Sequence, residues 1–437
     1  MAGLFFEQFL FKFLTAVFGV WIGISSVVSG TGKELPKAPE CFTPVLRFAV
    51  TSDVHLDGDP EQAAAKRLAD LFADSYAYAE SCEYKGLDAV IVAGDFATSG
   101  ADKEYELFNS IVNENIREGT ELITVLGNHE FISYRDEDPT VTYDAYKRNM
   151  GQDVDRHLVI NGYHFIACSY SDDGKTFNSK KEWLTAELDA ATAQDKNKPV
   201  FVVQHPHPFA TVFGSVNWGD LTVRSIYSKY PQIVDFSGHS HYSISDPRAI
   251  WQGSFTAVNT GSLSALMSNR NYIHGDEDAP GESGAFWIVE ADEAGNIRLM
   301  AYDIVSHMFF EKNDYYLTDV AKASAHRYTW GNMKSADTAP EFPDGAQITA
   351  EKDDVGNTVL VFPKAEGYWG AGDYKICVSA GSKDVYADTV ISNYVRADAG
   401  DMRVDIGAVE SGTYSVKIMP YSPYAKGGKS LTGSVTV

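Results

Sequence analysis

Short runs of β-branched and aromatic residues alternate with longer segments of helical spacing between residues 45 and 304. The runs expected to be strands are residues 46–50, 89–93, 122–126, 200–203 and 232–236. Residues 60–82 and 104–116 are expected to be helices, because apolar side chains such as Leu68, Leu71 and Phe72 recur every three or four positions. Alternation of this kind is typical of an α/β domain.

The sequence pattern changes after residue 310. A late strand region at 284–306 contains a hairpin turn at 293–296, and residues 337–344 carry two prolines and are followed by a glycine at position 345. Short alternating strands follow from residue 346, and residues 412–437 resemble the last strands of a fibronectin type III or immunoglobulin-like module. The expected organisation is an α/β domain at 45–312, a linker at 313–344 and a small all-β sandwich at 345–437.

The N-terminal residues 1–32 predict an export signal or a membrane anchor. Residues 13–32 contain no charge, residues 13–28 are mostly apolar, and small residues follow. The preceding region departs from the usual signal, because Glu7 is acidic and only Lys12 is basic. Either interpretation predicts a secreted or cell-envelope protein, and the second adds anchoring to a membrane.

The charge balance excludes one class of partner. The chain has 36 Lys and Arg against 60 Asp and Glu, a formal net charge of -24. A phosphate backbone requires a basic face, so general binding of nucleic acid is not expected.

Polar side chains that bind metals follow the expected strands at the point where each strand ends. The segments are Asp53-Val54-His55, Gly94-Asp95, Gly127-Asn128-His129-Glu130, Gln204-His205 and Gly238-His239-Ser240-His241. Ligands collect beyond the carboxyl ends of the strands in an α/β sheet, so these segments are expected to converge. Residues at i and i+2 of an extended chain point the same way, which favours joint binding by Asp53 and His55.

These motifs in this order resemble the signature of the calcineurin-like metallophosphoesterase superfamily. The resemblance covers about residues 45–306 and implies an α/β fold, a four-layer metallophosphoesterase β-sandwich flanked by helices. It implies hydrolysis of a phosphate ester by a hydroxide that bridges two metal ions.

The resemblance also implies a role for each motif residue. One metal would be held by Asp53, His55 and His241, the other by Asn128, His205 and His239, with Asp95 bridging both. His207 is an alternative to His205. His129 would stabilise the transition state or protonate the leaving oxygen. Position 98 is a threonine, where many relatives carry an aspartate that orients this histidine, so its partner is unassigned.

The ligand set bears on the metals and the substrate. Oxygen and nitrogen ligands without sulfur leave Mn, Fe, Zn or Ni as the two divalent ions. Two such ions, two aspartates and a hydroxide sum to a charge of about +1, which suits a phosphate ester and favours a phosphodiester over a monoester. Residues expected to face the substrate are Tyr134, Arg135, Trp218 and Arg248.

Two further interpretations stay open at this point. A 5′-nucleotidase-like activity would need a larger C-terminal domain with aromatic substrate motifs, and no such motif is present. A surface adhesion or carbohydrate-binding protein with a relic phosphoesterase domain is the alternative from another class. The intact ligand set argues against it.

Overall fold

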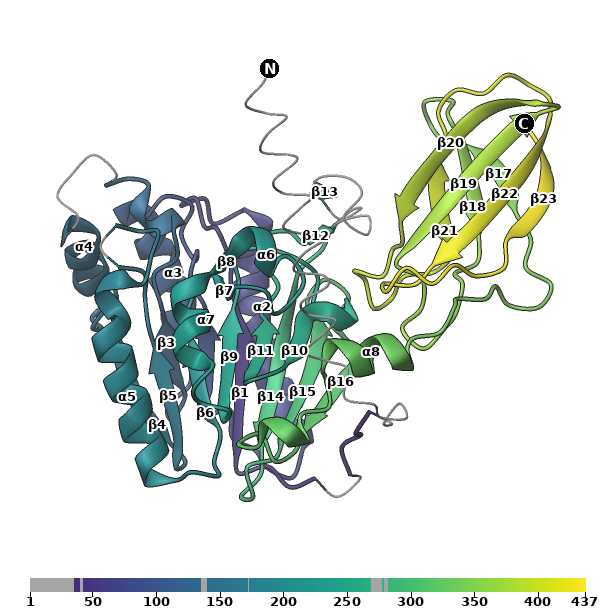
Figure 1. The fold of residues 1–437 in the computed structure, drawn as a ribbon. Coiled ribbons are helices and arrows are strands. Elements are labelled where there is room, and N and C mark those ends of the chain that lie inside the picture. Colours follow the sequence, from purple (N-terminus) through teal and green to yellow (C-terminus); the bar gives the residue numbers. More distant parts are fainter. Residues whose placement is uncertain (1–34, 40–41, 135–139, 172, 269–276, 279–281) are drawn as a thin grey trace, which may run out of the picture.

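The structure is a computed structural model that describes residues 35–39, 42–134, 140–171, 173–268, 277–278 and 282–437. Two parts are visible in Figure 1, a large part of mixed helices and strands and a smaller part of strands alone. The expected combination of an α/β fold with a small all-β part is confirmed.

The first large sheet has six strands in the order β16-β15-β14-β1-β2-β3. Its bounds are β1 Leu46–Thr51, β2 Ala89–Val92, β3 Glu121–Thr124, β14 Ala285–Ala291, β15 Ile297–Asp303 and β16 Met308–Leu317. Strands β1, β2 and β3 are parallel, and β14 joins β1 in antiparallel register. The parallel strands therefore bring their carboxyl ends to the same edge.

The second large sheet also has six strands, in the order β10-β11-β9-β6-β5-β4. Its bounds are β4 Arg156–Ile160, β5 Tyr163–Ala167, β6 Val200–Val203, β9 Ile233–Ser237, β10 Ile250–Gln252 and β11 Thr256–Asn259. The four central strands β5, β6, β9 and β11 are parallel. Edge strands β4 and β10 are antiparallel to their neighbours.

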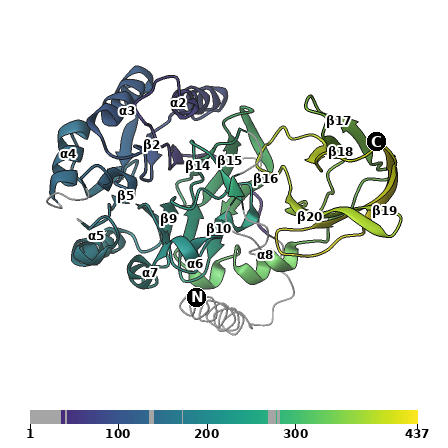
Figure 2. The ribbon, with the colours of Figure 1, turned by 90° about the horizontal axis from the view of Figure 1, so that it is seen from above.

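The two sheets stack face to face and helices cover their outer faces, which gives four layers. Phe48 of β1 packs edge-on against Phe165, Phe201 and Phe236 of the second sheet, with ring centroids 5.3, 5.1 and 5.6 Å apart. Seen from above in Figure 2, the helices of the first sheet and those of the second lie on opposite sides. They are α2 Ala63–Ser81, α3 Asp102–Asn115 and α4 Thr140–Met150 on one side, and α5 Lys181–Gln194 and α7 Leu221–Tyr227 on the other.

Burial on both faces explains the composition of the central strands. Every residue of β1 is buried, so the strand is nearly all apolar instead of alternating. Arg47 is the exception, and it tolerates burial because Glu290 of β14 pairs with its guanidinium at 2.6 Å. On α2 the buried side chains include Leu68, Leu71 and Phe72, the spacing that one apolar helix face requires.

The C-terminal part consists of two antiparallel sheets. The first has three strands, β17 Thr349–Lys352, β18 Thr358–Phe362 and β21 Met402–Asp405, in the order β17-β18-β21. The second has four strands in the order β20-β19-β22-β23, with bounds β19 Asp373–Ala380, β20 Lys383–Ile391, β22 Thr413–Tyr421 and β23 Leu431–Thr436. Leu360, Tyr374 and Ile418 belong to one apolar cluster shared by both sheets, so the part is a sandwich.

The region expected to be a linker, residues 313–344, packs against the large part. It contains the end of β16 and the helix α8 Trp330–Ala336, and Tyr328 and Met333 are buried in the core between the large sheets. Val395 and Tyr424 of the C-terminal part belong to the same core cluster. Apolar side chains within residues 313–344 account for this packing, because leaving them in water would cost free energy.

None of the helices within the described ranges is long and apolar enough to cross a membrane. The N-terminal segment 1–32, for which an export signal or anchor is expected, lies outside the described residues. Its function stays a prediction.

Candidate metal centre

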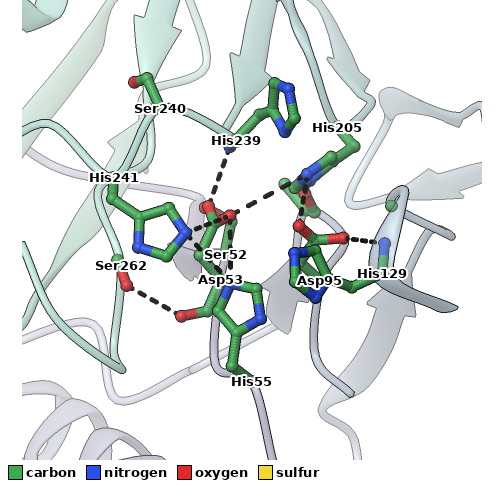
Figure 3. Close-up of polar contacts among 12 residues, drawn as sticks. Ser52, Asp53, His55, Asp95, His129, His205, His239, Ser240, His241 and Ser262 are labelled. Carbon is green, nitrogen blue, oxygen red and sulfur yellow. Dashed lines mark hydrogen bonds and ion pairs between the residues drawn. The ribbon is translucent and has the colours of Figure 1, made fainter. Parts of the chain in front are cut away.

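The motif residues gather at the carboxyl edge that the two sheets share. Asp53 and His55 follow β1, Asp95 follows β2, and Asn128 and His129 follow β3 of the first sheet. His205 follows β6, and His239 and His241 follow β9 of the second sheet. Figure 3 shows the side chains from both sheets turned toward a common centre.

The backbone at these positions is unusual for residues other than glycine. Asp53, His55, Asp95, His239 and His241 have φ of 50°, 51°, 51°, 73° and 54°. The expectation of extended chain at these positions is therefore wrong, although Asp53 and His55 still lie in one group of donor atoms. Left-handed residues turn the chain sharply after each strand, and strain of this kind concentrates at functional sites.

Two glycines permit the loops to approach the acidic side chains. A Cβ on Gly127 would overlap Oδ1 of Asp95, and a Cβ on Gly238 would overlap Oδ2 of Asp53. Any larger residue at either position would displace a carboxylate.

Asp53, His55 and His241 form the first group of donor atoms. Nε2 of His241 lies 3.2 Å and Nε2 of His55 lies 3.8 Å from Oδ1 of Asp53. The two imidazole Nε2 atoms are 3.0 Å apart. Such an arrangement of lone pairs is stable only when a proton or a cation lies among them.

Asp95, His205 and His239 form the second group, and Asp95 also lies in a third group with His55 and His129. Nε2 of His205 is 2.9 Å from Oδ2 of Asp95. Asp95 thus lies between the two halves of the centre, where the resemblance places the bridging ligand.

Buried polar atoms that lack hydrogen-bond partners show whether cations fit this site. Among the described residues, Oδ1 of Asp53, Oδ1 of Asn128 and Nε2 of His205 are buried without a partner of hydrogen-bond geometry. The contact of His205 with Asp95 is short, but it lacks that geometry. Buried polar groups almost always have partners, and all three atoms belong to residues expected to bind metals, so the residues fit two cations.

The histidine tautomers agree with metal binding. Nδ1 of His205 lies 2.8 Å from the carbonyl of Ala93, and Nδ1 of His241 lies 3.1 Å from that of Ala265. A carbonyl only accepts, so Nδ1 carries the proton in both rings. Nε2 of the neutral ring is then left with its lone pair for a metal.

In the absence of metal, protons take the place of the cations. Burial is the largest single influence and would raise the pKa of Asp95, but the charge and close contact of His205, with the charge of His55, together lower that pKa to about 2. Burial opposes the charge of His205 as well, yet Asp95 raises the pKa of this imidazole to about 10. Burial and the charge of His205 lower the pKa of His239 to about 4. A divalent ion must displace the proton on His205, so metal affinity rises with pH.

The structure supplies the partner of His129 that the sequence leaves open. Nδ1 of His129 is 2.8 Å from the backbone carbonyl of Thr98, and its backbone N–H donates to Oδ1 of Asp95 at 2.9 Å. The ring packs edge-on against His55 with centroids 4.4 Å apart. A main-chain oxygen of Thr98 orients this histidine, and side-chain identity at position 98 gives no sign of such a contact.

Glu130 is a buried residue of the site to which the sequence assigns no role. Its carboxylate accepts the backbone N–H groups of Asp95 at 3.2 Å, Ala97 at 2.9 Å and Gly127 at 2.7 Å. It therefore ties the loop after β2 to the loop after β3. Its place in the Gly127-Asn128-His129-Glu130 motif, two positions after a candidate ligand, is the signal that points to it.

His207, the alternative to His205, lies outside all three donor groups. Its Nδ1 is 3.1 Å from the hydroxyl of Ser237, and its Nε2 is 2.7 Å from that of Ser240. Burial lowers its pKa to about 3, so it is neutral. Both nitrogens are engaged, and the geometry favours His205.

The four residues expected to face a substrate have different surroundings. Trp218 packs edge-on against His239, with ring centroids 5.3 Å apart. Tyr134 interacts with Arg148 of α4. Arg248 is buried, and its Nε and a terminal nitrogen donate to Asp246 at 2.8 and 2.5 Å, so its charge is neutralised. Arg135 lies outside the described residues.

Comparison with solved structures finds distant likenesses. A purple acid phosphatase from yellow lupin (Lupinus luteus) seeds is 13% identical, with 68% of this chain and 56% of that chain covered and a TM-score of 0.47. A 5′-nucleotidase precursor from Thermus thermophilus is 17% identical, with 65% and 56% covered and a TM-score of 0.29. The alignments thus span 56% of each of these proteins, and neither likeness carries an argument about activity.

Comparison with families gives a direct result for the large part. No curated protein matches the chain in sequence. The predicted likeness of the C-terminal sheets to an immunoglobulin or fibronectin type III module is not confirmed and stays a prediction. Residues 46–243 match the family model described as calcineurin-like phosphoesterase. This segment contains all seven candidate metal ligands and is the calcineurin-like phosphoesterase domain of the chain.

Proposed function

We propose that the chain hydrolyses phosphate esters, with diesters favoured over monoesters, at a centre of two divalent metal ions. The observation that carries the proposal is the grouping of carboxylate and imidazole donor atoms within 4.8 Å of one another, among which Oδ1 of Asp53 and Nε2 of His205 are buried without hydrogen-bond partners. When bound, two such ions supply positive charge for the phosphoryl oxygens and lower the pKa of a water.

The side chains divide into two sets around Asp95. Asp53, His55 and His241 hold one ion, Asn128, His205 and His239 hold the other, and Asp95 serves both. The backbone carbonyls behind His205 and His241 fix which nitrogen faces inward, so the donors are oriented before an ion arrives.

His129 is the residue placed to move a proton. Its Nδ1 is engaged with the carbonyl of Thr98, so Nε2 is the atom that holds a proton and delivers it to the leaving oxygen. Proton delivery matters most for esters whose alcohol is a poor leaving group.

The charge around the centre supports a diester. Monoesters are dianions at neutral pH, and arginines commonly neutralise the extra charge. Arg248 is paired with Asp246 instead. The estimated charge of about +1 at a centre of two ions, two aspartates and a hydroxide matches the single negative charge of a diester.

The test compares bis-p-nitrophenyl phosphate with p-nitrophenyl phosphate in the protein loaded with Mn²⁺. The expected result is a larger kcat/KM for the diester and two metal ions per chain by elemental analysis.

Asp95→Asn should lose metal and lower kcat/KM at least about a thousandfold, because one carboxylate serves both ions. The matched control is Asp102→Asn, an exposed aspartate paired with Arg148. Normal metal content and turnover in Asp95→Asn would contradict the assignment. Metal binding without any hydrolysis would favour a relic domain.

A further inference from the structure

Large apolar side chains are exposed on the short segment that carries Trp218. Val216, Trp218 and Leu221 are 50%, 39% and 65% exposed, and they lie within six positions of one another. We refer to these three residues as the apolar ledge. Single exposed apolar residues are common, but three on one short segment, one of which contacts the candidate ligand His239, require an explanation.

Trp218 is the member of the ledge that reaches the centre. It ends the one-turn helix α6 (Ser215–Trp218), and its ring meets that of His239 edge-on at 5.3 Å and 87°. His239 is a candidate ligand of the second ion. A group bound to a phosphate at that ion would therefore pass close to the exposed part of the indole.

The segment that carries Trp218 is fixed by its surroundings. A Cβ on Gly214, whose φ is 84°, would overlap the ring of Tyr242. The hydroxyl of Ser215 accepts from the N–H of Thr211 at 2.8 Å and donates to the carbonyl of Val212 at 2.6 Å. Trp218 is thus held beside the centre on a rigid support, as a binding residue requires.

A further exposed apolar side chain follows His129. Ile132 is 36% exposed and lies three residues after this histidine, whose ring contacts His55. The loops next to candidate ligands of both ions therefore present apolar side chains to solvent. Arg248, the described arginine expected to face the substrate, is neutralised by Asp246. These exposed apolar side chains suit an apolar group of a ligand better than additional phosphates or carboxylates.

We propose that the apolar ledge binds the organic group of the substrate and selects phosphate esters that carry an aromatic or apolar substituent. This inference rests on the proposed function and names its substrate class. The metals bind only the phosphate, so discrimination between esters depends on side chains such as Trp218. An indole offers a large, rigid surface whose contact with a second ring changes binding by several-fold to about tenfold.

Two diesters with the same charge and the same leaving group isolate the substituent. The pair is phenyl p-nitrophenyl phosphate and methyl p-nitrophenyl phosphate, assayed with the protein loaded with Mn²⁺. The expected result is a kcat/KM about tenfold larger for the phenyl ester. Trp218→Ala should reduce this ratio to about two, whereas Trp218→Phe should retain most of the ratio.

Trp330 provides a matched control. It is 37% exposed on α8 and contacts Tyr424 at 5.2 Å, so Trp330→Ala removes an equally exposed indole elsewhere. The ratio should not change in this variant. Hydrolysis of both esters with equal kcat/KM, or a ratio that survives Trp218→Ala, would overturn the inference and leave the proposed function intact.

Binding without turnover separates the two proposals. Calorimetry would measure the binding of phenylphosphonate and of methylphosphonate to the Mn²⁺-loaded protein. The phenyl compound should bind about tenfold more tightly, and Trp218→Ala should abolish this difference in affinity. Should neither diester be hydrolysed, the proposed function fails and this comparison still decides the role of the ledge. Equal affinity for the two phosphonates would refute it.

Discussion

Glu130 fixes the main chain around the candidate metal ligands. Glu130 is completely buried and has no donor atom in any of the three groups. Its two oxygens accept N–H groups from both loops that carry Asp95 and Asn128. Burial and the charge of Asp95 raise the pKa of Glu130 to about 8. Three N–H donors and two nearby cations favour the ionised form, which we therefore expect in the metal-loaded protein.

Glu130→Gln tests this positioning role. The amide nitrogen of glutamine would face a backbone N–H, so at least one of the three hydrogen bonds to the two loops would be lost. We expect metal affinity to fall about 10- to 100-fold, with activity recovered at high Mn²⁺. The matched control is Glu104→Gln. Glu104 is another buried glutamate that accepts the N–H groups of Ser99 and Ala101 at the start of α3. Titration of metal-free protein with Mn²⁺ measures the effect, and equal affinities in both variants would contradict it.

At the scale of the elements, the strands that precede the candidate ligands could be predicted from the sequence. Strands such as β5 and β10, which pair with them or lie at the edge of the sheet, could not. The expected strands at 46–50 and 89–93 correspond to β1 and β2, because long apolar runs end at glycine or polar residues. Strand β5 is buried throughout, and β10 has only three residues, so neither shows a clear alternation. The convergence of the motifs was predictable from the position of each at a strand end. The left-handed backbone and the carbonyl partners were not, since they arise from contacts between distant loops.

Strand β9 carries a buried acid beneath the centre. Asp235 accepts from Nε2 of Gln204 at 3.0 Å and from the hydroxyl of Ser237 at 2.9 Å. Burial raises its pKa to about 8, although these hydrogen bonds act in the opposite direction. A pKa raised above the unfolded value of about 3.9 contributes stability below pH 4, and that contribution is lost as the pH rises toward 8.

Asp235→Asn should therefore be more stable than the wild type at pH 8 by at least about 1 kcal/mol, with the advantage shrinking toward pH 5. The asparagine oxygen can accept from Gln204, and its NH₂ can donate to Ser237. Urea unfolding at both pH values measures the difference. An exposed aspartate on β16 supplies the control, since Asp314→Asn removes a surface ion pair with Arg298. An advantage that is the same at pH 5 and pH 8 would show that Asp235 is ionised throughout.

At the scale of the whole molecule, the C-terminal sandwich is attached to the phosphoesterase part through polar and apolar contacts. Arg396 donates to Oδ2 of the buried Asp303 at 3.1 Å, and the N–H of Ala397 donates to the same oxygen at 2.8 Å. Val395 is completely buried in the core that also contains Tyr315 of β16. Figure 1 shows the sandwich beside β16 and α8, away from the helices that cover the outer faces. We expect the two parts to unfold together.

Val395→Ala tests this coupling, because it removes two buried methyl groups where the parts meet. It should lower the free energy of unfolding by about 1–3 kcal/mol and shift one thermal transition shared by both parts. The control is Val385→Ala on β20, where the side chain is 41% exposed and the same truncation should change little. Calorimetry distinguishes the alternatives. Two transitions, of which only the one belonging to the sandwich moves, would mean that the parts unfold independently. In that case the contacts of Arg396 and Val395 orient the sandwich without stabilising the phosphoesterase domain.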